Sequence, residues 1–168
     1  MKKLVYDMQL LSSLIVSPRA GQALYKDIDE FIKSPEAETP QKEEKNVVNV
    51  VYPFYQYGEY KKYDPEHAEY YLPGSSVKGA FQLQKSSIKH LMVDDVKVLN
   101  KDIVLRNLWK AQYLTEETEA RFDPFFENVG YEMIREGTVL QGVLYLEDDT
   151  EFSDVLERAN QDTKSKMK

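Results

Sequence analysis

The sequence predicts an α+β fold, in which helices cover one face of an antiparallel sheet. Of its 168 residues, 42% are hydrophobic and 12% are aromatic, so the chain has enough apolar surface for the core of one domain. Apolar runs typical of strands recur along the chain, and helical spacing of apolar residues occurs near the middle and near the C-terminus. Strands and helices in this arrangement are typical of α+β architectures.

The N-terminal part contains one long predicted strand. Apolar and polar residues alternate from Lys3, and an apolar run continues to Val16, before Pro18 ends the segment. Residues Arg19 to Lys33 have apolar side chains near helical spacing, which indicates a short helix or an ordered loop. The stretch from Ser34 to Asn46 contains two prolines and many charges, with hardly any large apolar residue. We expect this stretch to be a solvated, mobile insertion.

A tyrosine-rich segment follows the next predicted strand. That strand spans Val47 to Tyr52 and stops at Pro53. Six tyrosines then lie between Phe54 and Tyr71, counting both ends. Their rings could offer stacking surfaces to nucleic-acid bases, or half of them could pack against the sheet as amphipathic core residues.

A helix is predicted from about Ser76 to His90. Pro73 and Gly74 are a turn signal that delivers two serines able to cap a helix, and an apolar stripe follows at helical spacing. After this helix, the segments Val93–Leu99 and Ile103–Trp109 flank a polar turn. This pattern predicts a β-hairpin.

The C-terminal third predicts a polar link, two extended segments and a last helix. The link runs from Leu114 to Arg121, and the extended segments are Tyr131–Ile134 and Thr138–Leu146. Thr150 can cap the helix, which we expect to fray from Asn160 onward. We therefore expect one domain over residues 1–160, with the insertion at 34–46 and a polar tail at 161–168. The order of elements indicates a sandwich of the ferredoxin-like or RRM-like kind.

The composition argues against several classes of protein. Without cysteine the chain can form no disulfide or thiolate metal site, and with two histidines a His-rich metal centre or a serine–histidine triad is a poor fit. A net charge of -7 argues against coating nucleic acid by bulk charge alone. The N-terminus does not resemble a secretion signal, and no apolar run is long enough to span a membrane. We expect a cytoplasmic protein with no membrane partner and no cofactor.

The start of the predicted helix is the most specific local signal. Helix N-termini offer unsatisfied N–H groups and the positive end of a dipole, and both favour phosphate. The candidate phosphate site consists of Gly74, Ser75, Ser76 and Lys78. The same residues also fit a plain N-cap with a surface lysine. A P-loop is not supported, because Ala80 stands where that motif requires a lysine after its second glycine.

The same segment carries a family resemblance. Its sequence YLPGSSVKGAF, from Tyr71 to Phe81, resembles the "IPGSSLKGALR" signature of the RAMP superfamily of CRISPR-associated proteins. Leu10–Ser17 is similar to the family's first-strand pattern L-S-P-L-H-I-G-S, and Glu136–Gly142 is similar to its strand opener P-G-T-E-F-E. The resemblance spans roughly Lys3 to Leu146.

The resemblance implies an RRM-like fold and a place in a type III (Csm or Cmr) effector, in which such subunits stack along a guide RNA and hold its backbone. It is closest to the Csm subunit that caps the filament, or to the backbone subunit beside it. The RNA-binding residues that we predict are Gly74, Ser75, Ser76, Lys78, Gly79 and Arg19. The family continues to a last strand and a glycine-rich loop, which we expect this chain to lack. A sheet without that strand leaves an edge open to another chain.

Three functions remain open at this point. The first is a non-catalytic subunit that binds guide RNA and other type III effector subunits. The second is a protein-interaction module or mimic on the same fold, which binds effector subunits and blocks or completes their assembly. The third is a metal-dependent RNA-cleaving subunit, because the family's backbone subunit uses an acidic residue after its first strand, where this chain has Asp27 and Asp29. No metal ligand is predicted, and the lack of other catalytic side chains favours the first function.

Overall fold

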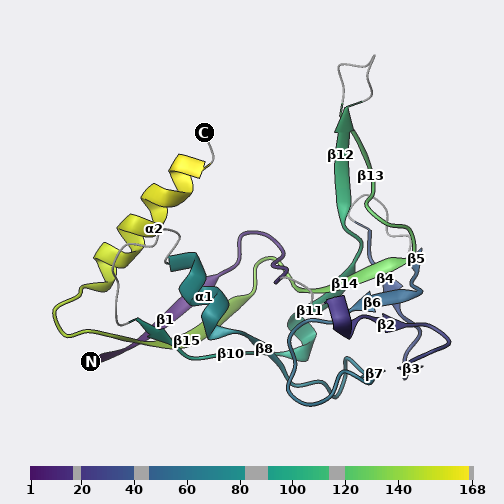
Figure 1. The fold of residues 1–168 in the computed structure, drawn as a ribbon, viewed down its shortest axis with the longest axis horizontal. Helices are drawn as coiled ribbons and strands as arrows, with labels where there is room; N and C mark the ends of the chain where they lie inside the picture. The colour runs from purple at the N-terminus through teal and green to yellow at the C-terminus, as the bar shows by residue number, and fades with distance from the viewer. Residues whose placement is uncertain (17–19, 40–45, 82–90, 114–119, 167–168) are drawn as a thin grey trace.

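The computed structural model describes residues 1–16, 20–39, 46–81, 91–113 and 120–166. Within these residues the fold is of mixed α and β type, mostly strands with two α-helices, in agreement with the α+β prediction (Figure 1). In the described part of the chain, no helix is long and apolar enough to cross a membrane.

A three-stranded antiparallel sheet brings the first strand against the last. In pairing order its strands are β1 (Lys2–Gln9), β15 (Val139–Leu146) and β9 (Met92–Val93). Burial alternates along β1 and β15, and along β1 it follows the predicted alternation of apolar and polar residues. Tyr6 lies across Gly142, where a Cβ atom would come within 2.3 Å of the tyrosine side chain. Glycine therefore makes room for this buried ring.

Both α-helices pack against one face of this sheet. They are α1 (Gly74–Phe81) and α2 (Phe152–Lys166). Val77 of α1 and Val155 of α2 share one core with the inward-facing leucines of β15. The rings of Phe81 and Phe152 meet edge to face with their centroids 5.7 Å apart. Each fully buried apolar side chain of this kind contributes about 1.5–3 kcal/mol to stability.

A second sheet lies at the other end of the molecule (Figure 1). Its strands, in pairing order, are β11 (Ile103–Arg106), β14 (Val129–Ile134), β6 (Val50–Tyr52) and β2 (Leu24–Tyr25). β14 and β6 run parallel, and the other neighbours are antiparallel. Leu14 forms a bridge to Ile134, which ties the segment after β1 to this sheet.

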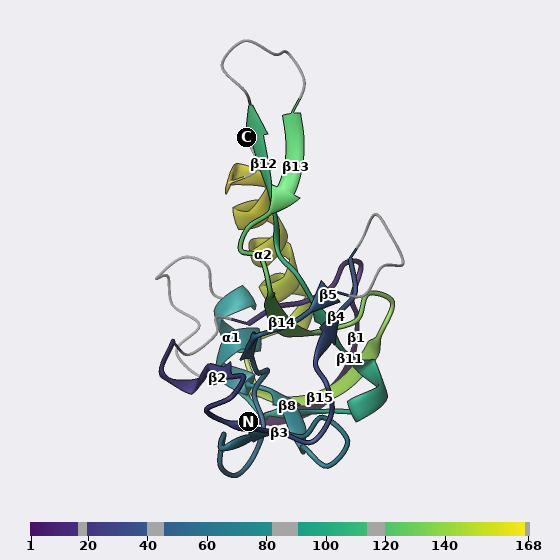
Figure 2. The same ribbon diagram turned by 90° about the vertical axis from the view of Figure 1, so that its right-hand side faces the viewer.

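Four short strand pairs complete the described fold. They are β8 (Tyr70–Leu72) with β10 (Val96–Val98), β3 (Glu30–Phe31) with β7 (Lys62–Tyr63), β4 (Glu36–Ala37) with β5 (Asn46–Val47), and β12 (Trp109–Tyr113) with β13 (Ala120–Pro124). The last pair projects from the body of the molecule (Figure 2). Two short 3-10 turns span Ala20–Gln22 and Asn100–Asp102.

The hairpin predicted from Val93 to Trp109 is wrong. Val96–Val98 pairs with β8, and Ile103–Arg106 pairs with β14. The 3-10 turn between them redirects the chain without bringing the two strands together. Their buried partners lie elsewhere in the sequence, so tertiary packing overrides the local pattern. A hairpin forms instead between β12 and β13, and β13 begins inside the stretch that we expected to be a polar link.

Other elements differ from the predictions in extent. β1 ends at Gln9 rather than Val16, and Leu11 beyond it is 91% exposed. The described residues between 20 and 33 form the 3-10 turn and two short strands, so the ordered-loop alternative applies rather than the helix. The stretch 34–46 is not wholly solvated, because Ala37 is fully buried and β4 pairs with β5; residues 40–45 lie outside the described residues.

The two helices start and end at other residues than predicted. α1 begins at Gly74, and residues 82–90 of the predicted helix lie outside the described residues. The cap of α2 is Glu151, whose carbonyl accepts a hydrogen bond from the N–H of Asp154, whereas the hydroxyl of Thr150 bonds to a neighbouring aspartate. α2 continues to Lys166, beyond the expected fraying point.

Candidate functional site

The RAMP-like segment forms the end of β8, a turn and the start of α1. The carbonyl of Pro73 accepts hydrogen bonds from the N–H groups of Ser76 and Val77, at 2.9 and 3.3 Å. Pro73 is therefore the N-cap residue, because its carbonyl accepts the first bonds of the helix. The two serines lie in the first turn, so the prediction that they cap the helix is wrong.

Gly74 and Gly79 have different surroundings. A Cβ atom on Gly74 would lie 2.1 Å from the carbonyl oxygen of Val93, so only glycine lets the helix start approach β9 this closely. Gly79 is exposed, and a Cβ atom there would meet nothing within 4 Å. Packing therefore requires glycine at position 74, whereas position 79 has room for a larger side chain.

A carboxylate already occupies the helix start. The N–H of Gly74 donates a hydrogen bond to Oδ1 of Asp95, at 2.7 Å. Asp95 follows β9 and is exposed, so it holds this position at the protein surface. The helix dipole favours a carboxylate here for the same reason that it would favour a phosphate. The sequence did not reveal Asp95 as part of the site, because no local pattern shows that this turn folds back on the helix.

The remaining predicted phosphate contacts divide between two sides of α1. Ser75, Lys78 and Gly79 stand at positions i, i+3 and i+4, so they share one face of the helix. Ser75 and Gly79 are exposed and Lys78 is half-buried. Ser76 lies on another side, where it lines an apolar pocket. Arg19 lies outside the described residues.

An open hollow lined by tyrosines lies beside Asp95. Tyr57 stacks on Tyr71, with ring centroids 4.3 Å apart and planes 20° apart. Burial, and then the charge of Asp95, raises the pKa of Tyr57. The hollow measures about 470 Å³, and its lining also includes Gln22, Gln56, Gly58, Glu59, Tyr60 and Lys61. Lys61 pairs with Glu59 at 2.5 Å, so the hollow carries charges of both signs.

The tyrosine-rich segment is divided between the core and the surface. Tyr63 and Tyr70 are buried at 8% and 2% exposure, and they pack in the two main cores. Tyr57 is 56% exposed, and its ring stacks at the surface. Some tyrosines of this segment are therefore core residues, and others present rings to the solvent.

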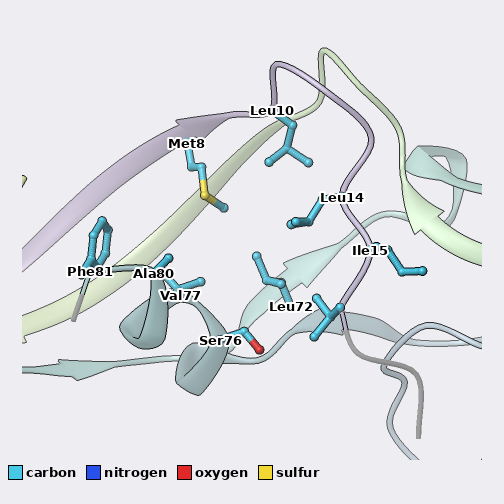
Figure 3. A pocket seen from close by; sticks show the side chains of 10 residues that line it. Met8, Leu10, Leu14, Ile15, Leu72, Ser76, Val77, Ala80 and Phe81 are labelled. Carbon is cyan, nitrogen blue, oxygen red and sulfur yellow. The ribbon is translucent and has the colours of Figure 1, made fainter. Parts of the chain in front are cut away.

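An apolar pocket of about 390 Å³ lies between α1 and the segment that follows β1 (Figure 3). In Figure 3, Met8, Leu10 and Leu14 approach the pocket from the side opposite to α1. The lining residues are Met8, Leu10, Leu14, Ile15, Val16, Leu72, Ser76, Val77, Ala80 and Phe81. Ser76 alone among these lining residues is polar, so the pocket suits an apolar group.

A buried carboxyl group lies beneath the tyrosine-rich segment. Glu132 on β14 is 3% exposed; its Oε1 accepts a hydrogen bond from the hydroxyl of Tyr70 at 2.6 Å, and its Oε2 accepts one from the N–H of Phe54 at 2.8 Å. Burial raises the pKa of Glu132 to about 7, although both hydrogen bonds lower it. Burial and the charge of Glu132 raise the pKa of Tyr70. In the sequence, the only sign of this group is one acidic residue in an apolar strand.

The two acidic candidates for catalysis lie in the turn between β2 and β3. Oδ2 of Asp29 accepts a hydrogen bond from the N–H of Tyr25, at 2.7 Å, which stabilises the turn. Asp27 is exposed and has a positive φ of 67°. Across the described ranges, no group of three or more histidine, aspartate or glutamate side chains is arranged to hold a metal ion.

These surroundings of α1 provide groups for binding. Ser75 and Lys78 offer a hydroxyl and an ammonium group on one face of the helix, and tyrosine rings lie next to the helix start. Asp95 adds a negative charge between them. No family model matches the chain, and no curated protein matches it.

Proposed function

We propose that the chain is a RAMP-like, non-catalytic subunit of a type III CRISPR effector, which binds guide RNA together with other effector subunits in the cytoplasm. The proposal rests on the segment from Tyr71 to Phe81, whose sequence resembles the family signature and which forms a strand end, a turn and a helix start. Ser75, Lys78 and Gly79 line one face of that helix start.

The order of elements supports an RRM-like or ferredoxin-like interpretation of the fold. In the split β-α-β-β-α-β arrangement, the third strand lies between the first and the second. β1, α1, β9, β15 and α2 follow this order along the chain, and β15 lies between β1 and β9. The second sheet and the projecting hairpin are then insertions. The sixth element of the arrangement, a strand beside β1, is not among the described residues.

Asp95 restricts how RNA would bind. Because this carboxylate accepts the N–H of Gly74, a phosphate would contact the hydroxyl of Ser75 and the ammonium group of Lys78 instead. Bases next to that phosphate could stack on Tyr57 at about 1–3 kcal/mol per base. The mixed charge of the surface limits affinity for free RNA. We therefore expect this subunit to contact RNA that the other subunits already hold.

Lys78→Glu tests the proposal. Guide-RNA affinity is measured over a salt series, for the chain alone and for the chain with type III effector subunits. If Lys78 neutralises a phosphate, the variant binds more weakly and its salt slope falls by about one. Lys164→Glu on the exposed side of α2 makes the same change of charge away from α1 and should leave affinity unchanged. An absence of salt-sensitive RNA binding by the wild type, both alone and in complex, would overturn the proposal.

The apolar pocket favours a second candidate function, a protein-interaction module that binds effector subunits without holding RNA. An open, nearly wholly apolar pocket suits an aliphatic or aromatic side chain of a partner better than it suits RNA. Ala80→Glu places a charge at its rim from an exposed helix position. Under this function, Ala80→Glu weakens binding to effector subunits in the absence of RNA, and Lys78→Glu leaves it unchanged. Equal binding by the Ala80 variant and the wild type would exclude this function.

A further inference from the structure

The outer edge of β1 is open. β1 pairs with β15 on one side, and within the described residues no strand pairs with its other side. The strand is eight residues long, and Val5 near its centre is 62% exposed. A long edge with an exposed apolar residue near its centre is a template for pairing with another strand.

The hydrogen bonds of the sheet show which residues of β1 face this edge. Leu10 donates to the carbonyl of Thr138, and its own carbonyl accepts from the N–H of Gly137, so its backbone groups point toward β15. Along an antiparallel strand this direction alternates, so the odd-numbered residues point the other way. A hydrogen bond on the other side of β15 supports this assignment. Val143 is the partner of Val5, and its carbonyl points away from β1, toward β9, where it accepts a hydrogen bond from the N–H of Asp94.

The edge therefore presents the backbone N–H and carbonyl groups of Lys3, Val5, Asp7 and Gln9. The side chains of the same four residues are exposed, on the face of the sheet that the helices leave uncovered. Along this edge a positive charge, an apolar residue and a negative charge follow one another at intervals of two residues. This pattern is complementary to itself when it is read in the opposite direction.

We infer that β1 pairs antiparallel with β1 of a second copy of this chain, with Val5 opposite Val5, so that a twofold axis joins two three-stranded sheets into one. In this register Lys3 of each copy stands opposite Asp7 of the other, on the same face of the joined sheet. Other registers are less favourable. With Leu4 opposite Leu4 or with Tyr6 opposite Tyr6 no Lys–Asp pair forms, and with Asp7 opposite Asp7 two like charges meet. The inference does not depend on RNA binding.

Charge exchange tests the pairing. Sedimentation equilibrium over a concentration series measures dimerisation of the wild type, of Lys3→Asp, of Asp7→Lys and of the double variant with both changes. Each single variant places like charges opposite one another twice per dimer, so we expect its dissociation constant to rise on the order of tenfold. The double variant restores opposite charges and should dimerise as the wild type does. Lys101→Asp makes the same change at an exposed residue away from β1 and should have no effect.

Cysteine scanning tests the register independently, because the chain contains no native cysteine. Hydrogen-bonded antiparallel partners have Cα atoms about 5.5 Å apart, which is within disulfide range. Val5→Cys should therefore form a covalent dimer under mild oxidation. Asp7→Cys and Val139→Cys should not, because their symmetry mates lie too far apart.

Four results would overturn the inference. A wild type that stays monomeric at the highest concentration shows that the edge does not pair with a second copy. If the double variant dimerises no better than the single variants, Lys3 and Asp7 do not face each other across the interface. Oxidation that links Asp7→Cys chains but not Val5→Cys chains assigns another register. Cross-linking of Val5→Cys to an added type III subunit, without a self-linked product, would identify the occupant of the edge as a strand of a different protein.

Discussion

The buried carboxyl group of Glu132 should make the stability of the fold depend on pH. Glu132→Gln removes the ionisable group and keeps its shape. A glutamine side-chain oxygen can still accept one of the two hydrogen bonds that Glu132 now accepts, from Tyr70 or from Phe54. The substitution therefore isolates the effect of the charge from that of packing.

The magnitude follows from the pKa of Glu132 in the folded chain, about 7, against its ordinary value of 4.5. Each pKa unit corresponds to 1.36 kcal/mol, so ionisation of this group costs the folded state about 3 kcal/mol. The sign follows from proton binding. Between pH 4.5 and pH 7 the folded state holds the proton more often than the unfolded state does, so the free energy of unfolding falls as pH rises. The stability that protonated Glu132 contributes, relative to the ionised group, is fully present below pH 4.5 and is lost above pH 7.

Urea denaturation at a series of pH values, followed by Trp109 fluorescence, measures this effect. The free energy of unfolding of the wild type minus that of Glu132→Gln should fall by about 3 kcal/mol between pH 4 and pH 8. Glu136→Gln, at an exposed residue two positions beyond β14, is the matched control and should show no such trend. A difference between wild type and Glu132→Gln that stays constant over this pH range would refute the reasoning.

Three further predictions concern the candidate site. Gly74→Ala should lower the free energy of unfolding by about 1–3 kcal/mol, because its Cβ would meet the carbonyl of Val93. Gly79→Ala should raise the free energy of unfolding by about 0.5–1 kcal/mol. Thermal unfolding measures both variants, and equal effects would contradict the packing described for Gly74. Asp95→Asn removes the negative charge at the helix start and should tighten RNA binding in the assembled complex, as measured by a filter-binding titration. Unchanged affinity would show that RNA does not bind near the helix start. The wild type should show no magnesium-dependent RNA cleavage, and cleavage that Asp27→Ala or Asp29→Ala abolishes would instead identify a nuclease.

The sequence predicted well those elements whose signal is local and continuous. β15 agrees with the apolar run from Thr138 to Leu146 within one residue, and the turn before α1 was marked by adjacent proline and glycine. Elements that depend on distant partners were predicted poorly. β10 and β11 look like the two arms of a hairpin, yet each pairs with a strand elsewhere in the sequence. Strands of two residues, such as β2 and β3, are too short to show any periodicity.

The candidate site divides in the same way. The residue types at the helix start indicated an anion site, and the structure has a negative group there, although that group is the protein's own Asp95. No spacing rule connects Gly74 with a side chain 21 residues away. The apolar pocket was equally hidden, because its lining comes from β1, the segment after it, β8 and α1. Such sites depend on tertiary contacts, which a single sequence does not display.

The pairing of β1 with β15 also sets the order of events during synthesis. Gln9 pairs with Val139, so the first strand emerges from the ribosome long before its partner exists. At the usual 5–20 residues per second the delay is roughly 10 s, which is longer than the folding time of most small domains. During this interval β1 stays unpaired, and the second sheet cannot protect it, because β14 of that sheet is made only shortly before β15. Chaperones that bind extended apolar segments would therefore meet this chain at its N-terminus, and the yield of soluble protein should depend on them.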